Sequence, residues 1–536
     1  MEGYAADGLA ASGEVLPADL ARVAAAAEAA EPGSGPVAVR AVRMIRAAGR
    51  LAALDDMEAL AVGESRRIGC ESLQLALDNQ AYEEARLPGV TGSDGVRRTR
   101  LEDSGASLLS VLGDVRVRRV AYRSGQRGVN ALHPRDAVLN LPPGGFSWQV
   151  RKLAEMTCRS GAYDSAREII EAATGVLIGK RQLQEMMEDC AAGAEAFAED
   201  RPVPQAPVLK GPGGQEQAAL GVASADGKGV SMLQDALREE TARKAARKEK
   251  THARKLGSGE KAGNKRIAET GVVYDCVPPD GEPRTAEEIM HRPPGRPARH
   301  PQALNRWYTC GIASSCAAVI ACVFAEIDRR DPARRRQWIA LADGNTHQID
   351  IFRAEAGKRG MAMPILIDLI HVIEYLWKAA RCFTPAGDNT AAEKQVAIWG
   401  TDILPGNSRG VIADIERQAA AHPPAPGSEH EKNIRRTCHY LTAKEPYLDY
   451  PTALASGWPV STGVIEGACR HLVGDRMGIT GARWSLKGAQ SVLWMRAIHA
   501  SGDTAAYWDH HIRQEYQRNH LSKFQDPPGS PLTLAA

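Results

Sequence analysis

The sequence has no Cys-x-x-Cys pair and no apolar run long enough to cross a membrane. Its first residues, Met1-Glu-Gly-Tyr-Ala-Ala-Asp7, lack the basic start and apolar core of a secretory signal. We therefore expect a cytoplasmic protein. In a reducing compartment the ten cysteines are expected to be buried or free thiols rather than zinc ligands or disulfides.

A strong net charge is also absent, since 67 lysines and arginines stand against 65 acidic residues. This balance leaves the affinity for nucleic acid open. The basic residues are nevertheless concentrated between residues 238 and 266, where few acids dilute them. The stretch is interpreted either as a basic loop that contacts phosphates or as a solvated helix. In the first interpretation Arg247, Lys248 and Lys250 contact DNA.

At 536 residues the chain is too long for one hydrophobic core, so we expect several domains. The breaker-rich segments Pro202-Val-Pro-Gln-Ala-Pro207 and Gly211-Pro-Gly-Gly214 indicate a linker near residues 200–218. Before this linker, residues 1–100 have helical periodicity. A strand with a basic outer face, around Val115-Arg-Val117, indicates a small β unit.

A pair of helices joined by a tight turn is predicted next. The first helix covers Tyr163–Gly175, a short turn follows at 176–179, and a second helix begins at Lys180. This pattern is shared by helix-turn-helix domains and by plain helical hairpins. Recognition helices read DNA with their N-terminal residues, so Lys180, Arg181 and Gln182 are the candidate DNA contacts.

Two stretches far apart in the chain present an aspartate in the same setting. Small and apolar residues lead to Asp226 in Gly221–Met232 and to Asp343 in Trp338–Gly344, and a glycine follows each aspartate. Short apolar runs of this kind predict strands that end in turns. One Asp-Gly alone is a common hairpin signal, but the repeated setting favours acids at strand ends, where α/β sheets bind ligands.

Two further runs add acids and candidate partners. Residues Pro364–Trp377 pass from a strand into a helix, and Asp368 and His371 are three residues apart on it. A later helix opens with hydroxyl residues and carries Glu466, with Arg470 one turn further on. Carboxylates from strand ends and from a helix suit two divalent cations about 4 Å apart, and Mg²⁺ prefers such oxygen ligands.

Taken in order, these stretches resemble bacterial insertion-sequence transposases of the DDE class, in particular the Kra-type group. The resemblance extends from about residue 105 to residue 500 and is more specific than any single motif. The segments that carry it are Ala225–Met232, Gly271–Pro278, Arg284–Ile289, Asp328–Pro332, Trp338–Gly344, Asp368–Trp377, Gly463–His471 and Met477–Trp484.

The resemblance implies an α/β protein in which an RNase H-like catalytic domain contains a helical insertion. Matched to the motif of the family, Asp226 is the first acid, Asp343 the second and Glu466 the third. All three would bind Mg²⁺, for which Mn²⁺ can substitute. Asp368 competes with Asp343 for the second position, because both end strand-like runs. His371 and Arg470 would be supporting groups, the arginine holding a phosphate through two hydrogen bonds.

The sequence and the resemblance together give a domain plan, with a helical and small β region and a helix-turn-helix before the catalytic core. The expected parts are a helical region at 1–104, the β unit and helix-turn-helix at 105–200, the first part of the core at 219–377 with the basic insert 238–266, the helical insertion at 378–460, the last part of the core at 461–500, and a tail at 501–536.

The resulting hypothesis is a transposase that cuts and transfers DNA strands at the terminal inverted repeats of an insertion sequence. Its partners would be transposon-end and target DNA, on which it would form a homo-oligomer. Arg483 is a further candidate DNA contact, whereas Trp484 is expected in the core. Two alternatives stay open: a helix-turn-helix DNA-binding protein whose acids are structural, and a hydrolytic nuclease that cuts DNA without joining it.

Overall fold

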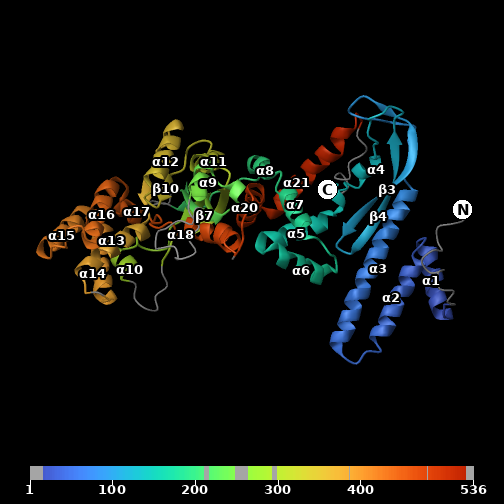
Figure 1. Ribbon diagram of the computed structural model, residues 1–536, viewed down its shortest axis with the longest axis horizontal. Helices are drawn as coiled ribbons and strands as arrows, with labels where there is room; N and C mark the ends of the chain where they lie inside the picture. The colour runs from blue at the N-terminus through green and yellow to red at the C-terminus, as the bar shows by residue number, and fades with distance from the viewer. Residues whose placement is uncertain are drawn as a thin grey trace. The chain divides into compact units, whose positions relative to one another are not determined.

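The computed structural model describes residues 16–210, 216–247, 264–291, 299–385, 387–479 and 481–526, except for the side chains of 245–247. The chain is a mixed α/β protein with a helical N-terminal region, a five-stranded mixed sheet with helices, and a helical C-terminal region (Figure 1). It divides into two compact units: Met1–Gly193 with Trp508–Ala536, and Ala194–Tyr507.

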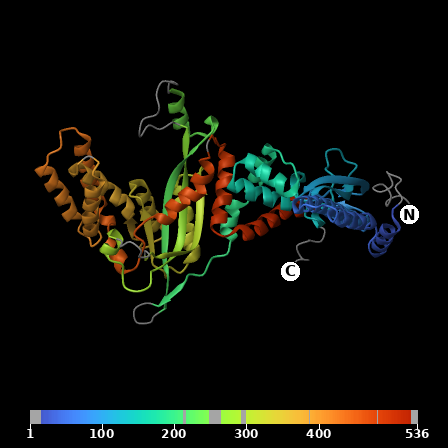
Figure 2. The same ribbon diagram turned by 90° about the horizontal axis from the view of Figure 1, so that it is seen from below.

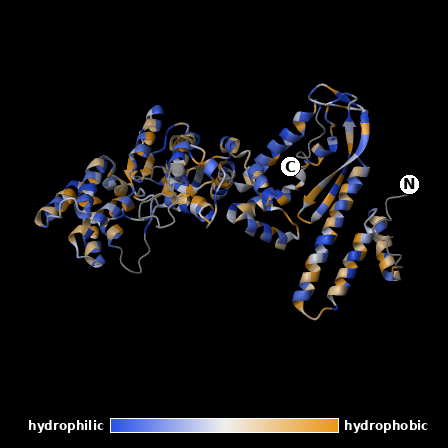
Figure 3. Ribbon diagram, in the orientation of Figure 1, coloured by the Kyte–Doolittle hydropathy of each residue, from blue (hydrophilic) through white to orange (hydrophobic). Residues whose placement is uncertain are grey.

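Two sequence-based expectations can be compared with the structure at once. All ten cysteines are free, as predicted. None of the helices in the described segments is long and apolar enough to cross a membrane. Along the helices, hydrophilic residues interrupt the hydrophobic ones (Figure 3).

The first unit combines three helices with a long β-hairpin. Gln74 of α3 pairs with the outer edge of β4: its amide nitrogen donates to the carbonyl of Arg116 at 3.0 Å, and its amide oxygen accepts from the Arg116 nitrogen at 2.7 Å. This side chain satisfies backbone groups that an edge strand would otherwise expose. The elements are α1 (Ala18–Ala30), α2 (Gly35–Ala48), α3 (Leu54–Tyr82), β1 (Val90–Thr91), β2 (Arg97–Arg98), β3 (Arg100–Ser110) and β4 (Gly113–Arg123).

The predicted helix pair is present in the same unit. Helix α6 ends at Gly175, whose φ of +73° is the left-handed conformation that favours glycine, and α7 begins at Lys180. The neighbouring elements are α4 (Pro134–Val138), η1 (Pro143–Gly145), α5 (Trp148–Ser160), α6 (Tyr163–Thr174), α7 (Lys180–Cys190) and, near the C-terminus, η5 (Leu521–Lys523).

A buried histidine gives this unit a pH-dependent stability. His511 is 2% exposed, and its ring meets the edges of Trp148 and Trp508 at centroid distances of 5.9 and 5.5 Å. Burial, assisted by nearby cations such as Arg151, lowers the pKa of His511 to about 4, against the opposing effect of Glu515. The imidazole is therefore neutral in the folded unit at neutral pH.

We expect His511→Phe to remove a pH-dependent loss of stability. The unfolded imidazole, with a pKa of about 6.5, takes up its proton first as the pH falls, so the folded unit loses stability from there down to about pH 4. Between pH 7 and pH 5 the wild type should lose about 2 kcal/mol that the variant keeps. Urea unfolding at both pH values, monitored by the hydrogen exchange of α5, measures this difference in the free energy of unfolding. An equal loss in both proteins would contradict it.

The second unit is built on a five-stranded sheet of order β11-β10-β7-β8-β9. Strand β7 is central: it pairs in parallel with β10 and antiparallel with β8, β10 pairs in parallel with β11, and β8 pairs antiparallel with β9. The strand that carries Asp226 is thus paired with the strand that follows the basic run. The strands are β7 (Leu220–Ser231), β8 (Lys265–Val277), β9 (Gln302–Gly311), β10 (Trp338–Ala342) and β11 (Ile365–Ile367), and a small hairpin of β5 (Val208–Lys210) and β6 (Glu216–Ala218) precedes them.

Helices cover both faces of this sheet. Alternate residues of β7 and β10, among them Ala223, Ala225 and Trp338, form one core with Phe324 of α11 and Phe352 of α12. Helices α18 and α20 contact the sheet from the other side. Helix α8 (Ala194–Asp200) precedes the strands, and the boundary between the two units falls within α21 (Thr504–Asn519). Further helices of this unit outside the insertion are α10 (Ala286–Met290), α11 (Cys316–Arg330), α12 (Thr346–Lys358), α18 (Gly463–Ala468), α19 (Asp475–Met477) and α20 (Leu486–Ala500).

The basic run follows β7. After η2 (Gln234–Ala236) its first part is a helix, α9 (Glu239–Arg247), which Figure 2 shows at one end of the β7–β8 hairpin. Arg243 and Lys244 pair within the helix with Glu239 and Glu240. The side chain of Arg247, together with Lys248 and Lys250, lies outside the described residues.

The stretch expected to be a helical insertion is helical. It packs as neighbouring helices, with α16 against both α13 and α15. The elements are α13 (Leu369–Phe383), α14 (Asn389–Ile403), α15 (Ser408–Ala421), α16 (Glu429–Lys444), η3 (Glu445–Tyr447) and α17 (Tyr450–Ala455).

Candidate active site

The register of the sheet places three aspartates at one level. Leu341 of β10 pairs with Ser224 of β7, so the same register continued by two residues sets Asp343 opposite Asp226. On the other side of β10, Ala342 pairs with Ile367, and the next residue sets Asp343 beside Asp368. Adjacent strands are about 4.8 Å apart, so each aspartate is a close neighbour of the next.

These aspartates project from the face of the sheet that carries α18. Residues two apart on a strand share a face. Ala223 and Ala225 point into the core beneath α11 and α12. Asp226 is one residue further along β7, so its side chain points to the opposite face of the sheet. Trp338 and Ala340 of β10 show the same alternation relative to Asp343. The acids therefore converge on the side where the helix of Glu466 lies.

Asp226 and Asp343 are both half-buried. Asp343 directly follows β10, whereas Asp226 lies within β7, which continues to Ser231, so the turn predicted at Asp226 is wrong. Oδ1 of Asp226 accepts from the Gly227 nitrogen at 2.6 Å, and Oδ1 of Asp343 accepts from the Asn345 nitrogen at 2.8 Å. Each carboxylate is thus oriented by the backbone that follows it while remaining accessible.

The glycine after Asp343 is required by two features of the structure. Gly344 has φ of +92°, where an L side chain is strained, and a Cβ there would lie 2.5 Å from the hydroxyl oxygen of Tyr440. Tyr440 belongs to α16 and stacks on Tyr375 with ring centroids 3.9 Å apart. One turn later on α16, Lys444 donates to the Thr346 hydroxyl at 2.8 Å. The helical insertion therefore holds the loop that presents Asp343.

Asp368 is fully buried and belongs to a hydrogen-bonded cluster. Its Oδ2 accepts from the Thr462 hydroxyl at 2.6 Å and from Nδ1 of His371 at 3.2 Å, and its Oδ1 accepts from the Ile370 nitrogen at 3.0 Å. Thr462 also lies 2.9 Å from Oε1 of Glu466. Ligand atoms of Asp368, His371 and Glu466 all lie within 4.8 Å of one another.

The charges within this cluster follow from the contacts. The hydrogen bond that His371 donates to Asp368 raises the pKa of His371 to about 9, so the imidazole is a cation at neutral pH. Burial alone would raise the pKa of Asp368, but the hydrogen bonds from His371 and Thr462 lower it below the usual value. Burial and the neighbouring Asp368 carboxylate raise the pKa of Glu466. A cation placed beside Glu466 would stabilise its ionised form.

The donor set fits a divalent cation held by oxygen ligands. Asp226, Asp343 and Glu466 are the accessible carboxylates, whereas both oxygens of Asp368 are engaged in hydrogen bonds. A site made instead of Asp368, His371 and Glu466 would require the imidazole to lose its proton and its bond to Asp368. We therefore infer that Asp368 and His371 orient and balance the site rather than bind the metal.

The helix that carries Glu466 lies against the strand that carries Asp226. Helix α18 contacts both β7 and β8, and the π-helical turn η4 (Cys469–Gly474) continues it. Burial and the nearby Asp226 carboxylate raise the pKa of the Cys469 thiol in this turn above its ordinary value. Cys469 is buried and its turn contacts β7. Within the described residues, the ligand atoms that lie within 4.8 Å of Glu466 in a group of three belong to Asp368 and His371.

The other predicted contacts are distributed over the chain. In the first unit Lys180, Arg181 and Gln182 are exposed; Lys180 pairs with Asp164 and Arg181 with Glu185, while the Gln182 amide oxygen accepts from the Gly179 nitrogen. In the second unit Arg470 and Arg483 are exposed. Trp484 is buried, as expected, and donates from its indole nitrogen to the Met477 carbonyl.

Three residues near the acids were not predicted as functional. Thr462 was interpreted as a helix cap, but its hydroxyl joins Asp368 to Glu466; its position four residues before Glu466 was the available signal. Glu269 is close to Asp226, and burial together with that negative charge raises its pKa. Nothing in the sequence near Tyr440 indicated its position beside Gly344.

The chain matches no model of a known protein family and no curated protein.

Thr462→Val is expected to weaken metal binding about 10–100-fold, as is usual when a group that orients a ligand is lost. The variant keeps the shape of the side chain but removes the hydroxyl that contacts Asp368 and Glu466. Titration with Mn²⁺, followed by the loss of its electron paramagnetic resonance signal, measures the affinity. Thr462→Ser keeps the hydroxyl and should bind like the wild type. Equal affinity of the Val and Ser variants would contradict the role of Thr462.

Proposed function

We propose that the protein is a transposase of the DDE class, which cuts and joins DNA strands at the ends of a bacterial insertion sequence with Mg²⁺ as cofactor. The observation that carries this proposal is the alignment of Asp226, Asp343 and Asp368 on three adjacent strands, with Glu466 brought over them by α18. Acids from separate parts of the sequence that meet on one face of a sheet suit a metal-dependent phosphoryl transfer site.

The topology of the sheet supports the RNase H-like part of the proposal. Asp226, the first acid, is on the central strand β7. The antiparallel strand β8 lies on one side of β7. The parallel strands β10 and β11, which lead to Asp343 and Asp368, lie on the other side. This is the arrangement that an RNase H-like domain would have. The helices of residues 389–455 are placed between the second and third acids in the chain, as a helical insertion would be.

The proposed mechanism assigns different tasks to the acids. Asp226, Asp343 and Glu466 would hold two Mg²⁺ ions. Such ions, when bound, would supply the activation of a water or 3′-hydroxyl and the stabilisation of the leaving oxygen in phosphodiester exchange. Asp368 fixes Thr462 and His371, and Thr462 in turn orients Glu466. The His371 cation offsets part of the negative charge that the acids accumulate.

DNA recognition is proposed for the first unit. Lys180, Arg181 and Gln182 are exposed at the N-terminus of α7, where a recognition helix contacts bases. The ion pairs of Lys180 with Asp164 and of Arg181 with Glu185 are exposed, so exchanging them for phosphate contacts costs little. A homo-oligomer on DNA is part of the proposal, because two transposon ends must be processed together.

A strand-transfer assay tests the proposal. Purified protein is mixed with end-labelled DNA from the boundaries of its element and with supercoiled target, in Mg²⁺, Mn²⁺ or EDTA. Joined product that depends on the metal is expected. Cleavage without joining would identify a hydrolytic nuclease, and tight binding without cleavage under every metal condition would identify a DNA-binding protein without catalysis.

A further inference from the structure

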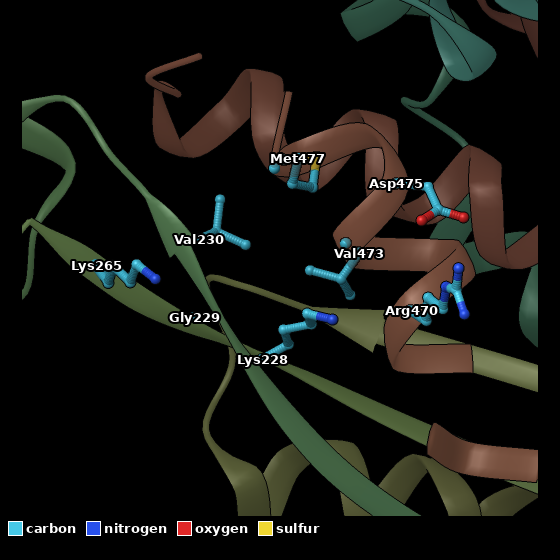
Figure 4. A pocket seen from close by; sticks show the side chains of 10 residues that line it. Lys228, Gly229, Val230, Lys265, Arg470, Val473, Asp475 and Met477 are labelled. Carbon is cyan, nitrogen blue, oxygen red and sulfur yellow. The ribbon is translucent and has the colours of Figure 1, made fainter. Parts of the chain in front are cut away.

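Beyond Asp226, strand β7 runs along one wall of a pocket that the proposed chemistry does not use (Figure 4). The pocket has a volume of about 430 Å³ and lies between the β7–β8 hairpin and the turns η4 and α19. Its lining residues are Lys228, Gly229, Val230, Lys265, Arg470, Val473, Gly474, Asp475, Met477 and Gly478.

Three cations surround this pocket. Lys228, Lys265 and Arg470 are exposed, and in the described part of the chain none of them has an ion-pair partner. The one acid of the lining, Asp475, accepts from Nδ1 of His471 at 3.1 Å. Figure 4 shows the Lys228 ammonium beneath Val473, on the side where Arg470 lies. Three cations against one acid favour an anionic ligand.

The floor of the pocket is apolar. Val230, Val473 and Met477 are each 2% exposed or less, and three glycines leave space above them. A free phosphate would use the cations but fill only a small part of the 430 Å³ volume. A ligand with an anionic group and an organic part would use both the cations and the space, because pockets combine apolar walls with few charged groups in this way.

The position of the pocket connects it to the acids. Asp226, Lys228 and Val230 alternate along β7, so their side chains lie on the same face of the strand. Lys228 is about 7 Å from Asp226 along the strand. Arg470 follows Glu466 by one turn of the same helical segment. A DNA strand that reaches the acids would therefore continue directly into the pocket.

We propose that this pocket binds one nucleotide of the DNA substrate next to the reacting phosphate. Its two flanking phosphates contact Lys228, Lys265 and Arg470, and its sugar or base occupies the space over Val230, Val473 and Met477. The proposal rests on the proposed function, because it takes the acids of this site as the place of strand cleavage. It extends that function by naming where the substrate strand is held in the absence of metal.

One glycine allows a test that leaves the charges in place. Gly474 has helical backbone angles, φ −58° and ψ −54°, so alanine is compatible with its conformation. A Cβ at this position would lie 2.9 Å from Nζ of Lys228, the far end of a flexible side chain. Gly474→Ala should therefore displace the Lys228 ammonium from the pocket without a penalty to folding.

The experiment measures binding of a fluorescent single-stranded oligonucleotide to the full-length protein in EDTA, so that no strand is cut. Lys228→Ala and Arg470→Ala should each weaken binding about tenfold, the usual effect of one charge-assisted hydrogen bond, and lower the salt dependence by about one phosphate contact. Gly474→Ala should weaken binding in the same direction. Lys394→Ala and Arg435→Ala remove exposed cations elsewhere in the second unit and should bind like the wild type.

Reductive methylation of the unaltered protein gives a second readout that does not depend on any variant. The oligonucleotide should protect Lys228 and Lys265 from methylation but leave Lys394 reactive, and inorganic phosphate at the same phosphate concentration should protect neither. Pocket variants that bind like the wild type, or protection by inorganic phosphate equal to that by the oligonucleotide, would overturn the proposal.

The outcome is separable from that of the proposed function. Loss of binding in the pocket variants with no cleavage by the wild type in Mg²⁺ or Mn²⁺ supports the nucleotide site and rejects the transposase. Metal-dependent cleavage by the wild type, together with unchanged binding in the pocket variants, supports the transposase and rejects the nucleotide site.

Discussion

Asp226→Asn and Asp343→Asn are each expected to lower the rate of metal-dependent strand cleavage about 10³-fold or more, with DNA binding retained. Both carboxylates are accessible, occupy opposing positions on β7 and β10, and are oriented by the nitrogens of Gly227 and Asn345. Asparagine keeps the shape of each side chain but removes the negative charge that holds a divalent cation. Cleavage of end-labelled DNA in Mg²⁺ measures the effect, and anisotropy in EDTA measures the binding.

Asp368→Asn should behave differently from the other two. Its carboxylate is buried and accepts three hydrogen bonds, from Thr462, His371 and the Ile370 nitrogen. The variant would disturb the orientation of Glu466 through Thr462, so we expect a loss of activity of about 10–100-fold, as for other groups that orient metal ligands. Asp350→Asn, which changes an exposed aspartate on α12, is the matched control and should cleave like the wild type.

The comparison decides which residue is the second acid. Complete loss of cleavage in Asp368→Asn, together with activity retained in Asp343→Asn, would reverse the assignment. Residual cleavage in Asp343→Asn equal to that of the control would exclude Asp343 from the metal site altogether. Retention of cleavage in the Asp226 variant would reject the proposed chemistry, because the central strand would then carry no catalytic acid.

The strands could be predicted from the sequence because local patterns determine them. Apolar runs that lead to Asp-Gly identified β7 and β10, and Asp343 directly follows its strand as expected. The strand end predicted at Asp226 was wrong, because β7 continues to Ser231 in its pairing with β8. The run before Asp368 also gave the expected strand and helix. These predictions needed only neighbouring residues, which is the range over which hydrophobic periodicity is informative.

The choice between Asp343 and Asp368 could not be made in the same way. Both aspartates end strands, and the sequence around them is similar in pattern. What separates them is burial and the hydrogen bond to Thr462, a residue 94 positions away from Asp368. The contact of Tyr440 with Gly344 is likewise made by an insertion helix. Side-chain contacts over such separations depend on the assembled fold and leave no local pattern.

A buried network of ion pairs escaped the sequence analysis for the same reason. Glu326 of α11 is 2% exposed, and its carboxylate pairs with Arg201, with Arg330 at 2.6 Å and with Arg329 at 3.2 Å. Arg330 also approaches Asp275 of β8 at 3.8 Å. The network joins the segment after α8, helix α11 and the sheet, and so supports the framework on which the acids are aligned.

Glu326→Ala is expected to reduce the free energy of unfolding of the second unit by about 3–5 kcal/mol, because removing one partner leaves buried charges uncompensated. Glu326→Gln, which keeps the volume, should cost a similar amount if charge rather than a cavity is responsible. Asp328→Ala is the control on the same helix: its ion pairs with Arg334 and Arg359 are partly exposed, so about 1 kcal/mol or less is expected.

Native-state hydrogen exchange of β8 and β10 measures these changes within the second unit, where opening of the central strands reports its overall stability. The comparison of the two Glu326 variants with Asp328→Ala decides whether buried charge is responsible for the loss of stability. If Glu326→Ala and Asp328→Ala destabilised the unit equally, water would have to solvate Arg201 and Arg330 in the variant, and the network would contribute no more than a surface ion pair. If only the alanine variant were destabilised and the glutamine variant were not, the cavity rather than the charge would account for the effect. A large and equal loss in both Glu326 variants would establish that the stability of the sheet that carries Asp226 depends on the charges of this buried network.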